Sequence, residues 1–179
     1  MTMRRPERGV ATDTPRAIRR LLAAYRGTCY TVQLAAGETR LRVSAAPPAA
    51  LMQLLQPDRP WVLISACNPH SRPRSARSNA LRMRALTRAL AAVDPLRVFD
   101  AAGGAPDRSW VEPGLLVIGL DPAITDALAR RFDQNALLAG RGAAPARLRL
   151  YRADWAAALG RVDTAGREWA EWAVESPRA

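Results

Sequence analysis

The sequence predicts an α/β domain of the α+β type, a single domain in which a mixed, partly antiparallel sheet is flanked by helices. Three observations lead to this fold class. A strand, a polar turn and a helix follow one another over residues 61–93. Two apolar runs, 61–67 and 115–120, have the composition of strands buried on both faces. A hairpin pattern over residues 29–43 adds an antiparallel pair of strands.

The first element expected in the domain is a helix. Asp13 or Thr14 can cap it, Pro15 suits its first turn, and Gly27 ends it. Its apolar residues recur at helical spacing and predict one buried stripe: Ile18, Leu21, Leu22 and Tyr25.

The hairpin comes next, with strands over 29–34 and 39–43 on either side of a turn at 36–38. A short helix is expected to open at Pro47 and Pro48. The buried strand over 61–67 then follows.

That strand should stop at Asn68 and Pro69, because proline restricts the residue before it and cannot donate to a strand ladder. A turn then leads to Ser75, which can cap a helix that reaches about Val93.

Further elements follow in the second half of the chain. A short strand over 96–99, a Gly- and Pro-containing loop over 100–109 and the strand 115–120 are expected in turn. Asp121 and Pro122 are a strong helix start, and Ile124, Leu128 and Phe132 lie four residues apart on one face. Two short strands are predicted over 136–139 and 148–151.

The chain is expected to divide into three parts. Residues 1–13 are polar and predict a flexible tail, and residues 14–151 form the domain. Residues 152–179 are Ala-rich and predict a helical extension whose tryptophans, Trp155, Trp169 and Trp172, could dock on the domain.

The basic composition needs a cautious interpretation. All 27 basic residues are arginine, and the net charge is +11. Strong positive charge favours polyanions, but few aromatic residues lie among the arginines to stack on bases. A solvated basic surface is therefore the first interpretation, and nucleic-acid contact is the alternative. The absence of lysine excludes Schiff-base chemistry and the P-loop lysine.

Cysteine and histidine are scarce. Cys29 and Cys67 both lie in apolar runs and are expected to be buried thiols rather than a disulfide, and His70 is the single histidine. Zinc sites take clustered Cys and His ligands, so we expect no metal and no cofactor. A Cys67–His70 nucleophilic pair is disfavoured because a thiol inside a buried strand is usually inert.

The sequence predicts a cytoplasmic protein without a membrane anchor. No segment reaches the roughly 18 apolar residues needed to cross a membrane. The first 13 residues are charged and lack the apolar stretch of a signal peptide.

Three polar motifs lie at the ends of predicted elements. The first is Asn-Pro-His-Ser at 68–71, after the buried strand, where α/β proteins tend to bind ligands and where the next helix offers free N–H groups. Asn79 belongs with it, because positions 79, 83, 86 and 90 share one helix face. Asn79 either ties down the turn or contributes to a site.

The second motif is Trp-Val-Glu-Pro at 110–113, which enters the strand 115–120. Beside tryptophan and proline, Glu112 could have a raised pKa and act as a general base, or it could accept loop hydrogen bonds. The third motif is Phe-Asp-Gln-Asn-Ala at 132–136. Asn135 suits a left-handed helix end, and Gln134 either caps that end or contacts a ligand.

Together the three motifs, in this order and spacing, resemble a bacterial family of unknown function, the DUF3293 domain proteins. The resemblance covers residues 25–140 and includes Ser75 and Asn79. Where this chain has Cys67 and Gly114, the family often has an aromatic residue and a serine. The family name carries no activity, so the resemblance supports a site without identifying its function.

The leading hypothesis is a polar cluster that binds a small ligand. Its candidate residues are Asn68, Ser71, Asn79, Glu112, Gln134 and Asn135. The alternatives are a non-catalytic interaction or nucleic-acid-binding protein that uses its arginines, and a purely structural network. Whether the chain is an enzyme, and its oligomeric state, stay open.

Overall fold

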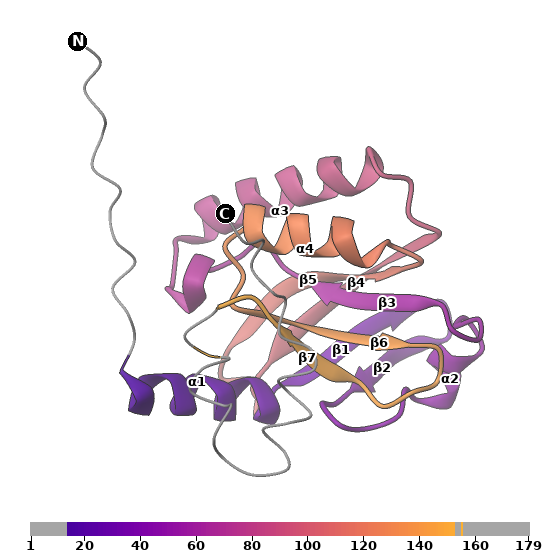
Figure 1. Ribbon diagram of the computed structural model, residues 1–179, viewed down its shortest axis with the longest axis horizontal. Helices are drawn as coiled ribbons and strands as arrows, with labels where there is room; N and C mark the ends of the chain where they lie inside the picture. The colour runs from indigo at the N-terminus through magenta and orange to yellow at the C-terminus, as the bar shows by residue number, and fades with distance from the viewer. Residues whose placement is uncertain (1–13, 153–154, 156–179) are drawn as a thin grey trace.

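The computed structural model describes residues 14–152 and 155, which form a seven-stranded sheet with helices on both faces (Figure 1). The strands are β1 (Cys29–Leu34), β2 (Gly37–Leu41), β3 (Pro60–Ile64), β4 (Arg97–Gly104), β5 (Val111–Ile118), β6 (Ala136–Arg141) and β7 (Arg147–Leu150). The helices are α1 (Pro15–Gly27), α2 (Ala49–Met52), α3 (Ala76–Ala91) and α4 (Pro122–Arg131), with one 3₁₀ turn at Pro69–Ser71. None of these helices is long and apolar enough to span a bilayer.

The strand order is β2-β1-β4-β5-β3-β6-β7, and each neighbouring pair is antiparallel. The predicted α+β domain with a partly antiparallel sheet and flanking helices is confirmed. Within residues 14–152, the sheet contains none of the parallel pairs that a mixed sheet would have. The chain runs directly between neighbouring strands from β1 to β2, from β4 to β5 and from β6 to β7. Helix α3 connects β3 to β4 and α4 connects β5 to β6, each crossing one intervening strand, and both helices cover the sheet.

Alternating side chains give the sheet an apolar core on each face. In β3, Trp61 and Leu63 belong to one core while Val62 and Ile64 belong to the other. The first core is closed by α1 and the second by α3 and α4, which lie on opposite sides of the sheet (Figure 1). The prediction that this strand is buried on both faces is confirmed, because every residue from 61 to 67 is buried.

Helix boundaries follow the predicted caps. Thr14 caps α1 by accepting from the Ala17 N–H, Ser75 caps α3 and Asp121 caps α4. On α1, Ile18 and Leu22 are buried. Local signals of this kind fix a helix start because they satisfy N–H groups that the first turn leaves free.

Several strand boundaries differ from the prediction, including the start of β5, which lies at Val111 rather than at residue 115. Strand β3 ends at Ile64, although the apolar run continues to Cys67. The predicted loop over 100–109 is wrong in its first half, because β4 continues to Gly104. Pairing with β5 on one side and β1 on the other supplies hydrogen bonds that small residues at 101–104 would not attract by propensity.

An ion pair joins α4 to the last strand. The Asp126 carboxylate accepts two hydrogen bonds from the Arg149 guanidinium, at 2.6 and 2.7 Å, and one from the Tyr151 hydroxyl at 3.0 Å.

Trp155 is fully buried in the core that α1 covers and meets the Tyr25 ring edge-on at 5.8 Å between centroids. The predicted tail 1–13 and nearly all of the predicted extension, including Trp169 and Trp172, lie outside the described residues.

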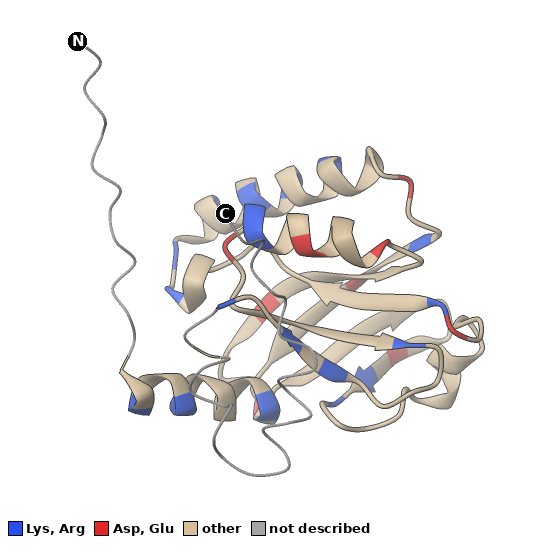
Figure 2. Cartoon of the chain, in the orientation of Figure 1, with Lys and Arg blue, Asp and Glu red and all other residues tan. Residues whose placement is uncertain are grey.

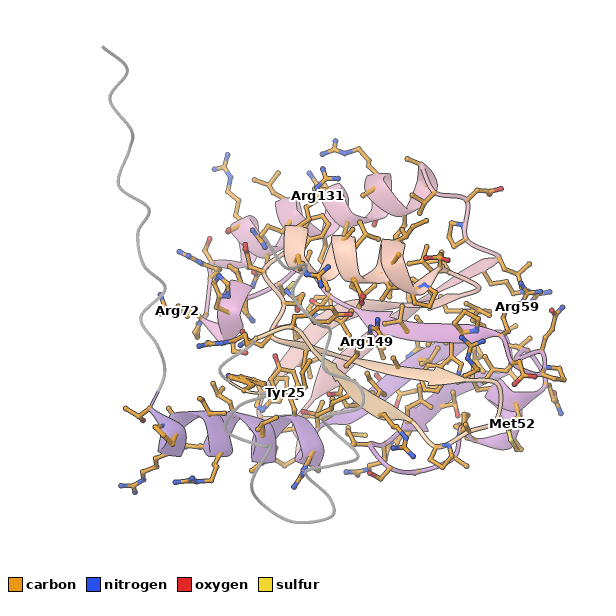
Figure 3. All side chains as sticks on the ribbon, viewed as in Figure 1. Tyr25, Met52, Arg59, Arg72, Arg131 and Arg149 are labelled. Atoms are coloured by element: carbon orange, nitrogen blue, oxygen red, sulfur yellow. The ribbon has the colours of Figure 1, made fainter. Side chains whose placement is uncertain are left out.

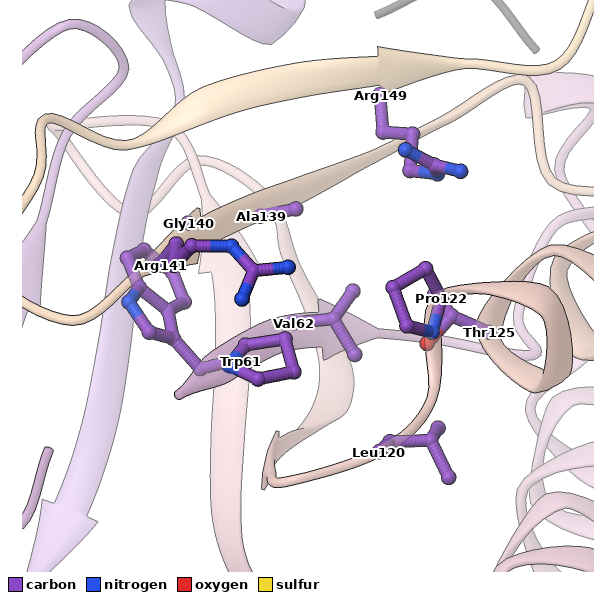
Figure 4. A pocket seen from close by; sticks show the side chains of 10 residues that line it. Trp61, Val62, Leu120, Pro122, Thr125, Ala139, Gly140, Arg141 and Arg149 are labelled. Atoms are coloured by element: carbon purple, nitrogen blue, oxygen red, sulfur yellow. The ribbon is translucent and has the colours of Figure 1, made fainter. Parts of the chain in front are cut away.

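A glycine in β6 makes room for the largest side chain of β3. The Trp61 indole lies against Gly140 and donates to the Gly142 carbonyl at 3.1 Å (Figure 4). A Cβ atom at position 140 would overlap the indole ring. The Trp61 ring is therefore held by a hydrogen bond at one end and by close contact with the Gly140 backbone, which only a residue without a side chain allows.

Gly140→Ala is expected to lower the free energy of unfolding by about 1–3 kcal/mol, because overpacking displaces a filled core. Urea unfolding would measure the change. Gly27→Ala is the control, since a Cβ there has nothing within 4 Å, and it should leave stability unchanged or slightly raised. Equal losses in both variants would contradict the packing argument.

Candidate functional site

The antiparallel strand order brings five strand ends to one edge of the sheet. The starts of β1, β5 and β6 lie beside the ends of β4 and β3. All three polar motifs are attached to these ends. We expected a site beyond the carboxyl ends of strands, as in parallel sheets. In this antiparallel sheet, neighbouring strands run in opposite directions, so strand starts and strand ends meet at the same edge. Glu112 at the start of β5 therefore lies beside Asn68, which follows β3.

One row of residues across this edge forms a gap. Tyr30 on β1 pairs with Gly103 on β4, and Gly103 pairs with Glu112 on β5. Paired residues project on the same face of a sheet. Because Gly103 has no side chain, no side chain stands between Tyr30 and Glu112 in this row, and Thr28 and the Tyr30 ring lie against the glycine.

The turn after β3 has an unusual backbone. Asn68, His70 and Ser71 all adopt positive φ angles, of 45°, 55° and 58°. This left-handed backbone conformation is disfavoured for L-amino acids, although asparagine tolerates it better than most residues. Strained backbone of this kind persists where surrounding contacts hold it, and it is concentrated at functional sites.

Asn68 and Asn79 hold the turn through a reciprocal pair of hydrogen bonds. The Asn68 N–H donates to Asn79 Oδ1 at 3.0 Å, and Asn79 Nδ2 donates to Asn68 Oδ1 at 3.0 Å. Asn68 Oδ1 also accepts from the Arg74 N–H, and Asn68 Nδ2 donates to Glu112 Oε2 at 2.7 Å. The predicted link between Asn79 and the turn is present, and the Asn68 side chain extends the hydrogen-bond network to Glu112.

Ser71 connects the turn to α1 and β6. Its Oγ lies 3.0 Å from the Tyr25 hydroxyl and accepts from Asn135 Nδ2 at 2.8 Å. Figure 3 shows Tyr25 on the side of α1 that faces the sheet. The Asn135 side chain is 1% exposed, and its Oδ1 has no hydrogen-bond partner among the described residues.

Gln134 uses both hydrogens of its amide on the protein. Its Nε2 donates to the carbonyls of Cys67 and Phe132, each at 3.1 Å. Arg82 of α3 binds the same region, donating to the carbonyls of Ala66 and Phe132 at 2.6 Å each. These bonds tie the segment that leaves β3 to the segment that enters β6.

The site residues surround a cavity of about 260 Å³, which we call the Glu112 cavity. Four of the six predicted ligand residues line it, namely Asn68, Ser71, Glu112 and Gln134. Asn79 and Asn135 do not line it but are bonded to Asn68 and Ser71. The other lining residues are Leu21, Ala24, Tyr25, Thr28, Tyr30, Pro73, Gly103 and Trp110.

Burial sets the electrostatics of this cavity. It raises the pKa of Glu112, while hydrogen bonding to Asn68 and the nearby Ser65 hydroxyl partly opposes that effect. Burial also raises the pKa of Tyr25 to about 12 and that of Tyr30 further. Both phenols are therefore neutral at physiological pH, and Glu112 is the titrating group that could move a proton here.

The two residues that sequence reasoning disfavoured as catalysts stay outside the cavity lining. Burial raises the pKa of the Cys67 thiol, which disfavours the reactive thiolate. The His70 ring lies with Nε2 3.7 Å from Asp133 Oδ1, and its backbone N–H donates to the Asp133 carbonyl at 2.8 Å. No group of three potential His, Cys, Asp or Glu metal ligands occurs in the described part of the chain.

Sequence reasoning missed the wall of the cavity contributed by α1 and β1. Tyr25 was assigned only to the apolar stripe of its helix, and Tyr30 to a strand. Gly103 was placed in a loop, so its empty position between Tyr30 and Glu112 was not expected. A hydroxyl on a buried helical stripe was the available signal, because a buried Tyr usually finds a polar partner.

Two other hollows have different chemistry. A small cavity of about 90 Å³ lies beside Trp61, Pro122 and Arg149 (Figure 4). A groove of about 230 Å³ crosses β1, β2 and β4, where Arg40 and Arg108 both pair with Glu38. The small cavity contains no residue of the three motifs and the groove contains only Val111, whereas the Glu112 cavity is lined by residues from all three motifs, so it is the candidate site.

Asn79→Ala is expected to lower the free energy of unfolding by about 1–3 kcal/mol, because it leaves polar groups of Asn68 unpaired. Chemical denaturation would measure it. Ser78→Ala, on the next residue of the same helix, is the control and should cost much less. A loss in Asn79→Ala no greater than that of the control would contradict the network as drawn.

Glu112 should also make stability depend on pH. A carboxyl group with a raised pKa in the folded state binds a proton more readily there than in the unfolded chain. The free energy of unfolding should therefore fall as pH rises from about 4, near the ordinary Glu value, through the raised pKa. Glu112→Gln lacks this loss and should gain stability over the native chain as pH increases to 7.

Thermal unfolding across this pH range would test the Glu112 effect. Glu38→Gln, which changes a carboxylate outside the Glu112 cavity, is the matched control. A free energy of unfolding for Glu112→Gln that falls relative to that of the native chain as pH rises would contradict the sign.

The comparisons with known proteins agree with the motif pattern. Residues 64–137 match the family model described as "Protein of unknown function (DUF3293)". No curated protein and no solved structure gives a significant match. The matched segment contains all three polar motifs together with α3, β4, β5 and α4. The match confirms the predicted resemblance to DUF3293 over residues 64–137, which contain the three motifs, while α1 and β1, which supply the other wall of the cavity, lie outside the matched residues.

Proposed function

We propose that this protein binds a small ligand in the Glu112 cavity. The observation that carries the proposal is the convergence of four predicted polar residues, from three separate motifs, on one cavity of about 260 Å³. Ligand sites combine apolar and aromatic walls with a few convergent polar groups. The Glu112 cavity has both, with Tyr25, Tyr30 and Trp110 among its walls.

The polar groups of the Glu112 cavity are held in place by the protein. Asn68 is bonded to Asn79 and Glu112, and Ser71 is bonded to Tyr25 and Asn135. Side chains fixed in this way need little ordering when a ligand binds, which favours affinity. The strained turn supports the same proposal, because its left-handed residues direct Asn68 and Ser71 toward the cavity wall at a cost in stability.

The structural-network alternative is compatible with part of this geometry. The bonds between Asn79, Asn68 and Arg74 stabilise the turn whether or not a ligand binds. A network that served stability alone would fill the space around Glu112 or pair its charge. Glu112 instead borders a cavity, which supports a ligand.

The nucleic-acid alternative stays a prediction. The basic residues are distributed over the helices and several strands rather than gathered in one patch (Figure 2). No arginine contributes to the described lining of the Glu112 cavity. Phosphate binding there would also place an anion beside Glu112. No observation favours nucleic acid over a small molecule at this site.

Protein-observed NMR with a library of small fragments would test the proposal. Binders are expected to shift the amide signals of Ser71, Glu112 and Gln134. Ala24→Phe should weaken binding by inserting a ring from the α1 side, and Gly103→Val should do so by filling the gap in the sheet row. A Cβ at position 103 would make ordinary contacts of 3.4–3.6 Å with Thr28 and Tyr30, and urea unfolding would check that the valine variant is folded.

Ala23→Phe is the matched control, because Ala23 is exposed on the same helix and does not line the cavity. It should bind fragments like the native chain. The proposal fails if no fragment shifts the cavity signals, or if binding survives both Ala24→Phe and Gly103→Val in folded protein.

A further inference from the structure

We propose that the ligand of the Glu112 cavity is a small organic cation, a protonated amine attached to a flat apolar body. The inference rests on the ligand-binding function proposed above and adds the chemical class of the ligand. Three features of the cavity support it: a carboxylate without an ion-pair partner among the described residues, several fixed hydrogen-bond acceptors in the lining, and aromatic walls.

The first feature is the charge of Glu112. The chain has 27 arginines, yet among residues 14–152 and 155 no basic side chain forms an ion pair with this carboxylate. Its hydrogen-bond partners are neutral: Asn68 donates to Oε2, and the Ser65 hydroxyl lies nearby. Glu112 is also the one charged residue of the described lining. A buried carboxylate without a counter-charge is costly, and a bound cation would supply the missing partner.

The second feature is the direction of the hydrogen bonds. The single hydroxyl hydrogens of Thr28 and Tyr30 are directed to the carbonyls of Ala24 and Tyr25. Both amide hydrogens of Gln134 are directed to backbone carbonyls. Because carbonyls need a donor, the Gln134 NH₂ group must face them and its amide oxygen must face the other way. These side chains therefore present oxygen lone pairs to a ligand.

An ammonium group matches this pattern, because it has three donors and no acceptor. Glu112 Oε1 can accept one of its hydrogens in a charge-assisted bond. The Gln134 carbonyl oxygen, which makes no hydrogen bond within the described chain, can accept another. A carboxylate or phosphate ligand would instead place a second negative charge beside Glu112.

The third feature is the aromatic wall. Tyr25, Tyr30 and Trp110 all line the cavity, and Trp110 is 47% exposed. Aromatic faces attract cations and also accept a flat apolar body. Tyr25 and Tyr30 stay neutral, since burial raises the pKa of both, so they do not compete with Glu112 for the charge of the ligand.

Size limits the ligand. The cavity volume of about 260 Å³ lies just below the roughly 300–1,000 Å³ typical of drug-sized ligands. One ring with a short aminoalkyl arm suits that space. A metal ion suits it less, because Ca²⁺ takes 6–8 oxygen ligands and one carboxylate is present in the described lining.

Shape-matched trios of fragments would test the charge preference. Each trio carries one body, phenyl, indole or cyclohexyl, on a two-carbon arm that ends in an amine, an alcohol or a carboxylate. Affinities at pH 7 would be measured by NMR titration of the native chain. The best amine is expected to bind roughly 10- to 100-fold more tightly than its alcohol, as for a hydrogen bond to a charged group, and the carboxylate should bind weakest.

Glu112→Gln should abolish most of the advantage of the amine over the alcohol, because Gln keeps the shape and loses the charge. Glu38→Gln is the control and should keep that advantage. Alcohols or carboxylates that bind as well as amines, and that Ala24→Phe blocks, would overturn the cation inference while leaving the ligand-binding function intact. If no member of any trio and no library fragment binds the cavity, both proposals fall.

Discussion

The side chain of Asn68 is the constraint on which the site depends. It accepts from Arg74 and Asn79, and it donates to Glu112. A short amide at a φ of 45° can meet these demands because asparagine tolerates the left-handed region and carries both a donor and an acceptor. Aspartate would have a similar shape, but it would set a second negative charge against Glu112. The Asn68 side chain therefore holds the left-handed turn, contacts the start of α3 and binds the Glu112 carboxylate.

Sheet topology explains why one residue can reach so far. Antiparallel neighbours place the end of β3 next to the start of β5, and the start of β6 on its other side. The two apolar cores hold this edge from both faces, with α1 on one side and α3 and α4 on the other. Polar groups at this edge can therefore be buried on the α1 side while Asn79 of α3 holds them through hydrogen bonds from the other side. Asn79 on α3 and Tyr25 on α1 accordingly stabilise the same turn from opposite directions.

Local chemistry in the sequence predicted much of this structure, and pairing between distant segments produced the rest. The caps at Thr14, Ser75 and Asp121 depend on neighbouring residues, so the helix starts were predictable. The extension of β4 to Gly104 depends on β1 and β5, which no local pattern reports. The polar motifs identified four residues of the cavity lining. Tyr25, Tyr30 and Gly103 were missed as site residues because the cavity exists only once α1 crosses the end of the sheet.

The turn over Asn68 and Ser71 has a kinetic consequence. Its left-handed residues are held by hydrogen bonds to α1, α3, β5 and β6, so alternative arrangements of the turn would leave several of these polar groups unpaired at once. The ligand proposed for the cavity would then meet a surface that is already arranged, and its encounter would be limited by diffusion and orientation rather than by a slow rearrangement of the chain. Discrimination between related ligands would accordingly be expressed in how long each one stays bound.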